Sequence, residues 1–292
     1  MGTVAGLVER SAAAYAAAVP VTPEDEGFFG PASVAWRVST DLAAPVAGLR
    51  SLLIQALHPL AMAGVDQHSD WRTDPVGRLA ATSAYEVTVT FGDRAGATRA
   101  AQRVRAIHEH VRGVDTVTGQ PYAAGDPALL VWVHAALVDS GLAASARFGT
   151  PLTAADADRY VAEMTIAAEL LGAPHEMIPD SVAALERYFA GVRADLRRTP
   201  AAAESMSYLL DPPGLDEDIA ELWQDVRDAA VLALPGWAIQ MYGYAAPPPL
   251  TAERRTEIRQ ALGVLDAVFL GEPGVLEARQ RIIARMRSAG RK

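Results

Sequence analysis

The stretch RVRAIHEHVRG, residues 103–113, places Val104, Ile107 and Val111 at helical spacing and carries two histidines. Apolar residues three and four positions apart line one face of an α-helix. The same spacing recurs along nearly the whole chain, and alternating β-branched residues are scarce outside EVTVTFG at 86–92. The sequence therefore predicts an all-α fold.

The two histidines of this stretch point in different directions if residues 93–112 form one helix. At about 100° per residue, Val104 and Val111 fall within about 60° of His108, which puts His108 at the edge of the buried stripe. His110 falls at about 200°, on the polar face. The sequence therefore predicts that the two rings do not hold one metal ion from this helix.

A histidine at the edge of an apolar stripe needs a partner for at least one ring nitrogen. One alternative for His108 is a backbone carbonyl or a side chain of another helix. The other is the iron of a haem, with the imidazole as axial ligand. Arg105 and Arg112 lie within about 60° of His108 on the same wheel. Their guanidinium groups are interpreted either as partners of haem propionates or as solvated charges.

Proline and glycine divide the rest of the chain into expected helices. A single all-α domain over residues 1–292 is the simplest interpretation, with YAAPPPL at 244–250 as an extended link to two docked helices at its end. Asp126, Thr153 and either Asp180 or Ser181 are the expected N-caps. The helices are expected at about 3–18, 31–41, 45–63, 75–91, 93–112, 126–146, 153–171, 180–196, 199–210, 215–233, 235–242, 251–269 and 273–289.

Composition narrows the class of function. Half of the 292 residues are hydrophobic and 21% are charged, which is typical of a globular protein with an ample core. The net charge of -9 lacks the basic footprint of a nucleic-acid binder. Lys292 is the only lysine and there is no cysteine. Schiff-base lysines, disulfides, thiolate metal sites and cysteine nucleophiles are therefore excluded.

No membrane or export signal is recognised. Glu9 and Arg10 interrupt the place where a signal peptide has its apolar core. No run of about 18 uncharged apolar residues occurs, so no integral membrane segment is expected. We therefore expect a cytoplasmic protein, and the sequence leaves open whether it is a homo-oligomer.

Familiar catalytic motifs are missing. There is no Gly-x-Gly-x-x-Gly after a strand, no Walker loop and no Gly-x-Ser-x-Gly elbow. The Glu-x-x-His pairs of di-iron bundles and the His-Glu-x-x-His of zinc proteases are also absent. The other histidines are dispersed, so a mononuclear site assembled from distant segments remains an alternative. They are His58, His68, His134 and His175.

Five blocks in order resemble a known family, the DUF2236 or MpaB-type oxygenases, to which the catalytic domain of the latex-clearing rubber oxygenases also belongs. The resemblance covers about residues 27–190 and implies an all-helical, distantly globin-like core that holds haem b. The blocks are QALHPLAMAGVDQHSDW at 55–71, DPVGRLAATSAY at 74–85, RVRAIHEHVRG at 103–113, YAAGDPALLVWVHAALVDS at 122–140 and LLGAPHEMIPDS at 170–181.

The resemblance also implies roles for single residues. The proximal haem ligand of the rubber oxygenases falls on His108, the residue that the helical wheel selected. Their distal Arg-x-x-Lys-Thr block falls on Arg78 and Thr82, with Ala81 at the lysine position. That departure puts rubber cleavage itself in doubt. His58 and His134 stand in family-like blocks and are further candidates to contact the cofactor, although a hydrogen-bonded core histidine is the simpler interpretation of each.

The sequence thus supports two hypotheses. The first is a haem b-dependent oxygenase that acts with dioxygen on a hydrophobic small molecule such as an alkene or isoprenoid. The alternative is a non-catalytic protein of the same fold that binds haem or a hydrophobic ligand, which the missing lysine motivates. Dioxygenase, monooxygenase and peroxidase chemistry are not distinguished by the sequence.

Overall fold

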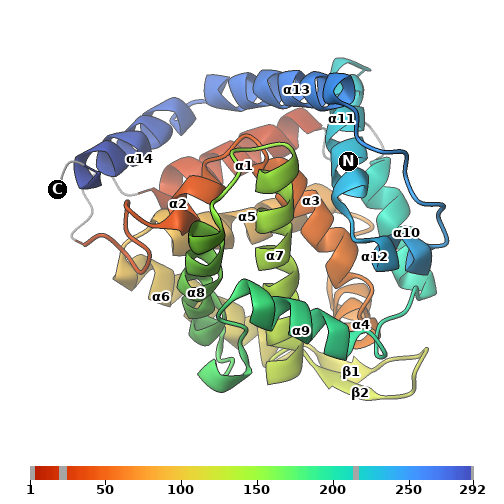
Figure 1. The fold of residues 1–292 in the computed structure, drawn as a ribbon. Coiled ribbons are helices and arrows are strands. Elements are labelled where there is room, and N and C mark those ends of the chain that lie inside the picture. Colours follow the sequence, from red (N-terminus) through yellow and green to blue (C-terminus); the bar gives the residue numbers. More distant parts are fainter. Residues whose placement is uncertain (1–3, 20–24, 213–216, 291–292) are drawn as a thin grey trace.

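The computed structural model describes residues 4–19, 25–212 and 217–290. The side chains of residues 4–8, 10, 11, 75–80 and 217–219 lie outside this description. The described chain is an all-α domain, as the sequence predicts, and contains one small hairpin (Figure 1). Its elements are α1 (Val4–Ala18), α2 (Val34–Ser39), α3 (Ala44–Gln55), α4 (Pro59–His68), α5 (Pro75–Phe91), α6 (Arg94–His108), β1 (Arg112–Val114), β2 (Pro121–Ala123), α7 (Pro127–Arg147), α8 (Ala154–Leu171), the 3-10 helix η1 (His175–Met177), α9 (Val182–Val192), α10 (Pro200–Leu210), α11 (Glu217–Ala233), α12 (Gly236–Tyr242), α13 (Ala252–Gly271) and α14 (Val275–Ala289).

Helix α7 runs through the middle of the molecule, with α3 on one side and α8 on the other (Figure 1). It begins where Asp126 caps the amide of Ala128 and Pro127 occupies the first turn, as expected from the sequence. By length and hydropathy α7 alone is long enough to cross a membrane, but 67% of its most apolar window is buried within the described protein. It is therefore the central core helix of this fold.

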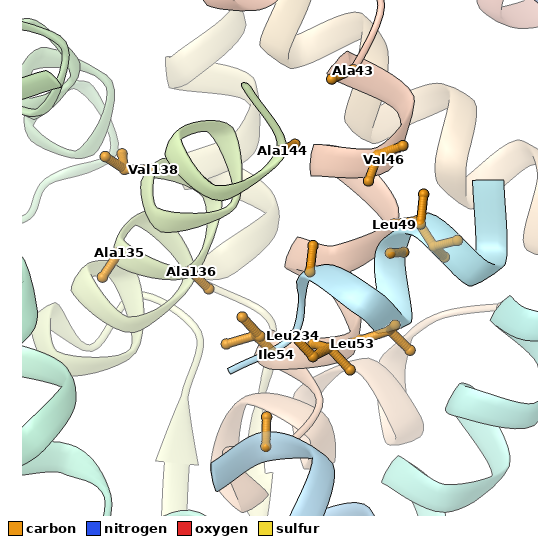
Figure 2. Close-up of a cluster of buried hydrophobic side chains, with 14 of the residues drawn as sticks. Ala43, Val46, Leu49, Leu53, Ile54, Ala135, Ala136, Val138, Ala144 and Leu234 are labelled. Carbon is orange, nitrogen blue, oxygen red and sulfur yellow. The ribbon is translucent and has the colours of Figure 1, made fainter. Parts of the chain in front are cut away.

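The main core lies between α3 and α7 (Figure 2). Leu49, Leu53 and Ile54 of α3 point toward the small residues Ala135 and Ala136 of α7. Small residues on one helix let the larger side chains of the other approach closely. Each fully buried leucine or isoleucine contributes about 1.5–3 kcal/mol to folding.

A buried arginine crosses this core. Arg50 of α3 is 3% exposed, and its guanidinium donates to the carbonyl of Ala233 at the end of α11 and to the hydroxyl of Ser140 on α7. A third bond, 2.7 Å long, goes to the carboxylate of Asp139. Burial lowers the pKa of Arg50, and the neighbouring Asp139 opposes that shift. Arg50 therefore joins three helices that are far apart in sequence.

One expected helix is broken in two. The sequence predicted a single helix over 45–63, but α3 and α4 are separate and bent by 102°. Pro59 stands in the first turn of α4 and has no amide hydrogen to continue the α3 ladder. His58 lies at this corner with an extended backbone. The break therefore sets the direction of the chain on both sides of His58.

The last two helices pack on the body of the protein, as the sequence predicted. Helix α13 packs against α11, and α14 packs against α1 (Figure 1). Ala278 and Ile282 of α14 are buried in one cluster with Val19, Trp36 and Phe91. Phe91 is the last residue of α5, so the C-terminal helices support the helix that carries Thr82.

Candidate functional site

His108 is the last residue of α6. The helix starts where the Asp93 carboxylate caps the amide of Gly96 at 2.6 Å, and it buries Ala97, Ala100 and Ala101. The side chain of His108 is half-buried and its Nδ1 atom is shielded from solvent. Its place at the edge of the buried face agrees with the wheel.

The expected helix over 93–112 was too long at its end. After His108 the chain turns and enters the hairpin of β1 and β2. Gly113 explains the turn, because a Cβ there would lie 2.8 Å from the Tyr122 hydroxyl and 3.0 Å from Gln67 Oε1 on α4. The strand can therefore lie on α4 only with glycine at this position. His110 stands outside the helix, exposed, with Nδ1 2.9 Å from the Ala106 carbonyl oxygen.

The two arginines expected beside His108 are both on the surface. The Arg105 side chain passes the C-terminus of α8, where a Cβ on Gly172 would lie 4.0 Å from Arg105 Nε. Arg112 belongs to β1 rather than α6, and its Nε donates to the carbonyl of Glu109 at 2.9 Å. The structure thus places one arginine on each side of the end of α6. Their role toward propionates stays a prediction.

His134 is a buried, neutral histidine of α7. It is 7% exposed, and burial lowers its pKa to about 4. Its Nε2 atom has no hydrogen-bond partner within the described residues. A buried polar atom without a partner is rare in proteins and marks a place where a water or a ligand is expected.

His58 is buried on a different side of α7. It is 8% exposed, and its ring centroid lies 5.7 Å from that of Trp132. Its Nδ1 atom lacks a partner among the described residues, and its pKa is lowered chiefly by burial, against the opposing charge of Asp195. Trp132 and His134 project about 200° apart on the helix. The structure therefore does not bring His58 and His134 to one face of α7.

Helix α5 has the bounds that the sequence predicts and packs against α6 and α1. Thr82 is half-buried on it and Ala81, at the position of the family's lysine, is exposed. The side chain of Arg78 lies outside the described residues.

Sequence reasoning missed a buried acid on α5. Glu86 follows Thr82 by one helical turn, and burial alone raises its pKa to about 7. Its neighbour Tyr85 has a hydroxyl that is shielded and without a partner in the described part of the chain. The available signal was that Glu86 is the only charged residue from Leu79 to Gly92.

Glu86 gives the stability of the protein a defined pH dependence. Its folded pKa of about 7 stands above the ordinary value of 4.5, so the folded state keeps a proton that the unfolded chain releases between these two pH values. Stability therefore falls as pH rises through this window, and above it the ionised carboxylate costs about 3 kcal/mol. We expect Glu86→Gln to stabilise the protein by about 2–3 kcal/mol more near pH 8 than near pH 5, measured by urea unfolding.

Glu277→Gln is the matched control for this measurement. The Glu277 side chain is 80% exposed, so its replacement is expected to change stability by less than about 0.5 kcal/mol at either pH. An effect of Glu86→Gln that is the same near pH 5 and near pH 8 would contradict the raised pKa.

The elements that carry these residues identify the family. The chain matches the family described as "ER-bound oxygenase mpaB/B'/Rubber oxygenase, catalytic domain" over residues 36–267. It belongs to this family, as the resemblance implied, and the match runs beyond the expected 27–190 through most of α13. A search of curated proteins found no match to the chain. A search of solved structures found none either, so the globin-like arrangement stays a prediction.

Proposed function

We propose that this protein is a haem b-dependent oxygenase that acts with dioxygen on a hydrophobic small molecule, with His108 as the axial ligand. The observation that carries the proposal is membership of an oxygenase family over a range that includes α5, α6 and α7. Family membership supports oxygenase chemistry in general, and the haem and the substrate are our inference.

The residues present suit a porphyrin better than a bare metal ion. The described residues contain no group of three or more histidine, aspartate or glutamate side chains able to hold a metal. A porphyrin brings four nitrogen ligands of its own and needs one imidazole from the protein. His108 offers a half-buried ring at the end of a helix. The partnerless nitrogens of His58 and His134 show that the interior has polar positions that the described protein does not satisfy.

Each residue then has a defined role. Haem, when bound, supplies the redox chemistry with dioxygen. His108 holds the group, and the guanidinium groups of Arg105 and Arg112 bind its propionates from the surface. Neutral His134 donates or accepts a hydrogen bond in the interior. Thr82 and Arg78 of α5 provide polar contacts on the distal side.

A non-catalytic carrier of haem or of a hydrophobic ligand is the second candidate, and Ala81 favours it. The methyl group of Ala81 supplies neither the charge nor the hydrogen bonds of the family's lysine. Sustained oxygen uptake with an alkene substrate would rule this candidate out.

The test is a titration of the purified protein with haemin, followed by absorption spectra in the oxidised and reduced states. We expect a Soret band that saturates at one haem per chain, and oxygen uptake when an isoprenoid alkene is added. Absence of a Soret band would overturn haem binding. A saturable Soret band without oxygen uptake by any alkene would support the carrier instead.

A further inference from the structure

The carboxyl group of Glu86 lies inside the protein without a counter-charge. Burial is the only cause that shifts its pKa, so no cation of the described protein compensates it. The side chain nevertheless keeps an intermediate exposed fraction. A group that is deep among protein atoms and still touched by solvent-sized space borders an internal space rather than the outer surface.

Two tyrosine hydroxyls share this neighbourhood. Tyr85 of α5 has a shielded hydroxyl without a partner in the described chain, and its pKa is raised by burial and then by the charge of Glu86. Tyr160 of α8 is 4% exposed, and its pKa is raised by burial first, then by Glu86 and Glu163. Glu86 therefore acts on a hydroxyl from each of two helices.

The directions of the side chains leave room between them. Successive residues of a helix project about 100° apart, so Tyr85 and Glu86 flank a space and do not bond to each other. The Tyr160 hydroxyl reaches α7, where a Cβ on Gly141 would lie only 2.5 Å from it. Glycine at 141 thus permits this hydroxyl to stand at the junction of α7 and α8.

The surroundings of these polar groups are apolar. Val89 stands one turn after Glu86 on α5 and is 3% exposed, and Met164 stands one turn after Tyr160 on α8 and is 5% exposed. Polar atoms in such surroundings are retained when a water or a ligand bonds to them.

We propose that Glu86, Tyr85 and Tyr160 form a polar subsite that binds the neutral hydroxyl group of an otherwise apolar ligand. A hydroxyl donates one hydrogen bond and accepts others, so it satisfies a carboxylate and a phenol together. A carboxylate or phosphate head group would be repelled by Glu86. The subsite rests on the proposed function only in so far as this ligand is taken to be the substrate of the oxygenase.

The experiment compares three ligands with the same ten-carbon chain, namely 1-decanol, decanoate and decylammonium, by calorimetric titration of the full chain near pH 7. We expect 1-decanol to bind at least about tenfold more tightly than decanoate or decylammonium. Glu86→Leu and Tyr85→Phe should each weaken 1-decanol binding about tenfold, whereas Glu86→Gln, whose amide also donates and accepts, should stay within about threefold of the parent.

Glu109→Leu is the matched control, because Glu109 is exposed at the end of α6 and should leave 1-decanol binding unchanged. Tyr85→Phe removes only a hydroxyl without a protein partner, so it keeps the fold, which thermal unfolding checks. Equal affinity for the three head groups, a preference for decylammonium, or 1-decanol binding that is unaffected by Glu86→Leu would each overturn the subsite. The measurement needs neither haem nor turnover, so its failure is distinct from that of the proposed function.

Discussion

Replacement of His108 by alanine is expected to weaken haem binding on the order of 100-fold or more. The axial imidazole is the one covalent link that we propose between protein and iron, and loss of supporting contacts alone typically costs 10–100-fold in metal affinity. The side chain is half-buried at the end of α6, so its removal leaves the caps and the alanine face of that helix intact. The measurement is haemin titration followed through the Soret absorbance.

His110→Ala is the matched control for this prediction. His110 lies two residues further on, is exposed, and contacts only the Ala106 carbonyl among the hydrogen bonds described for it. It should bind haem as the parent does. Haem binding that survives in His108→Ala and is lost in His134→Ala would instead place the ligand on α7. Retention of haem by both variants would point to His58.

Arg50→Ala is expected to destabilise the fold by about 3–5 kcal/mol. The substitution leaves the Asp139 carboxylate without its cation and leaves the Ala233 carbonyl and the Ser140 hydroxyl each short of one hydrogen bond. Removal of one partner of a buried ion pair costs this much because the remaining groups stay desolvated. Urea unfolding followed by circular dichroism measures the loss.

Arg159→Ala separates this effect from the loss of any ion pair. Arg159 is 58% exposed and pairs with Glu163 at 2.7 Å on the surface of α8. Exposed pairs contribute about 0–1 kcal/mol, so the control should remain close to the parent. Similar losses for the two variants would mean that the three-way contact of Arg50 contributes no more than a surface pair.

The sequence predicts helices well where local chemistry decides them. The start of α7 at Asp126 and Pro127 and both ends of α5 follow from caps, proline and apolar spacing. The hairpin of β1 and β2 was missed because each strand has only three residues and is held by contacts with α4 that are distant in sequence. The early end of α6 has the same origin.

The site divides in a similar way. Family blocks and helical spacing select His108, Thr82 and His134 from the sequence, and their cofactor contacts stay predictions. Glu86 was missed because its unusual proton affinity arises from the packing of α5 among other helices. A lone glutamate in the sequence has the same appearance whether it faces water or the interior.

The packing of α14 links the two ends of the chain to the interior. Ala278 and Ile282 close the cluster that holds Trp36 and Phe91, and α14 also rests on α1, which in turn covers α5. Cutting the peptide chain at the proline link would therefore not free the last helices, because their release exposes aromatic rings to water. Unfolding of the C-terminal segment and loosening of the wall that bears Thr82 and Glu86 are thus one cooperative event.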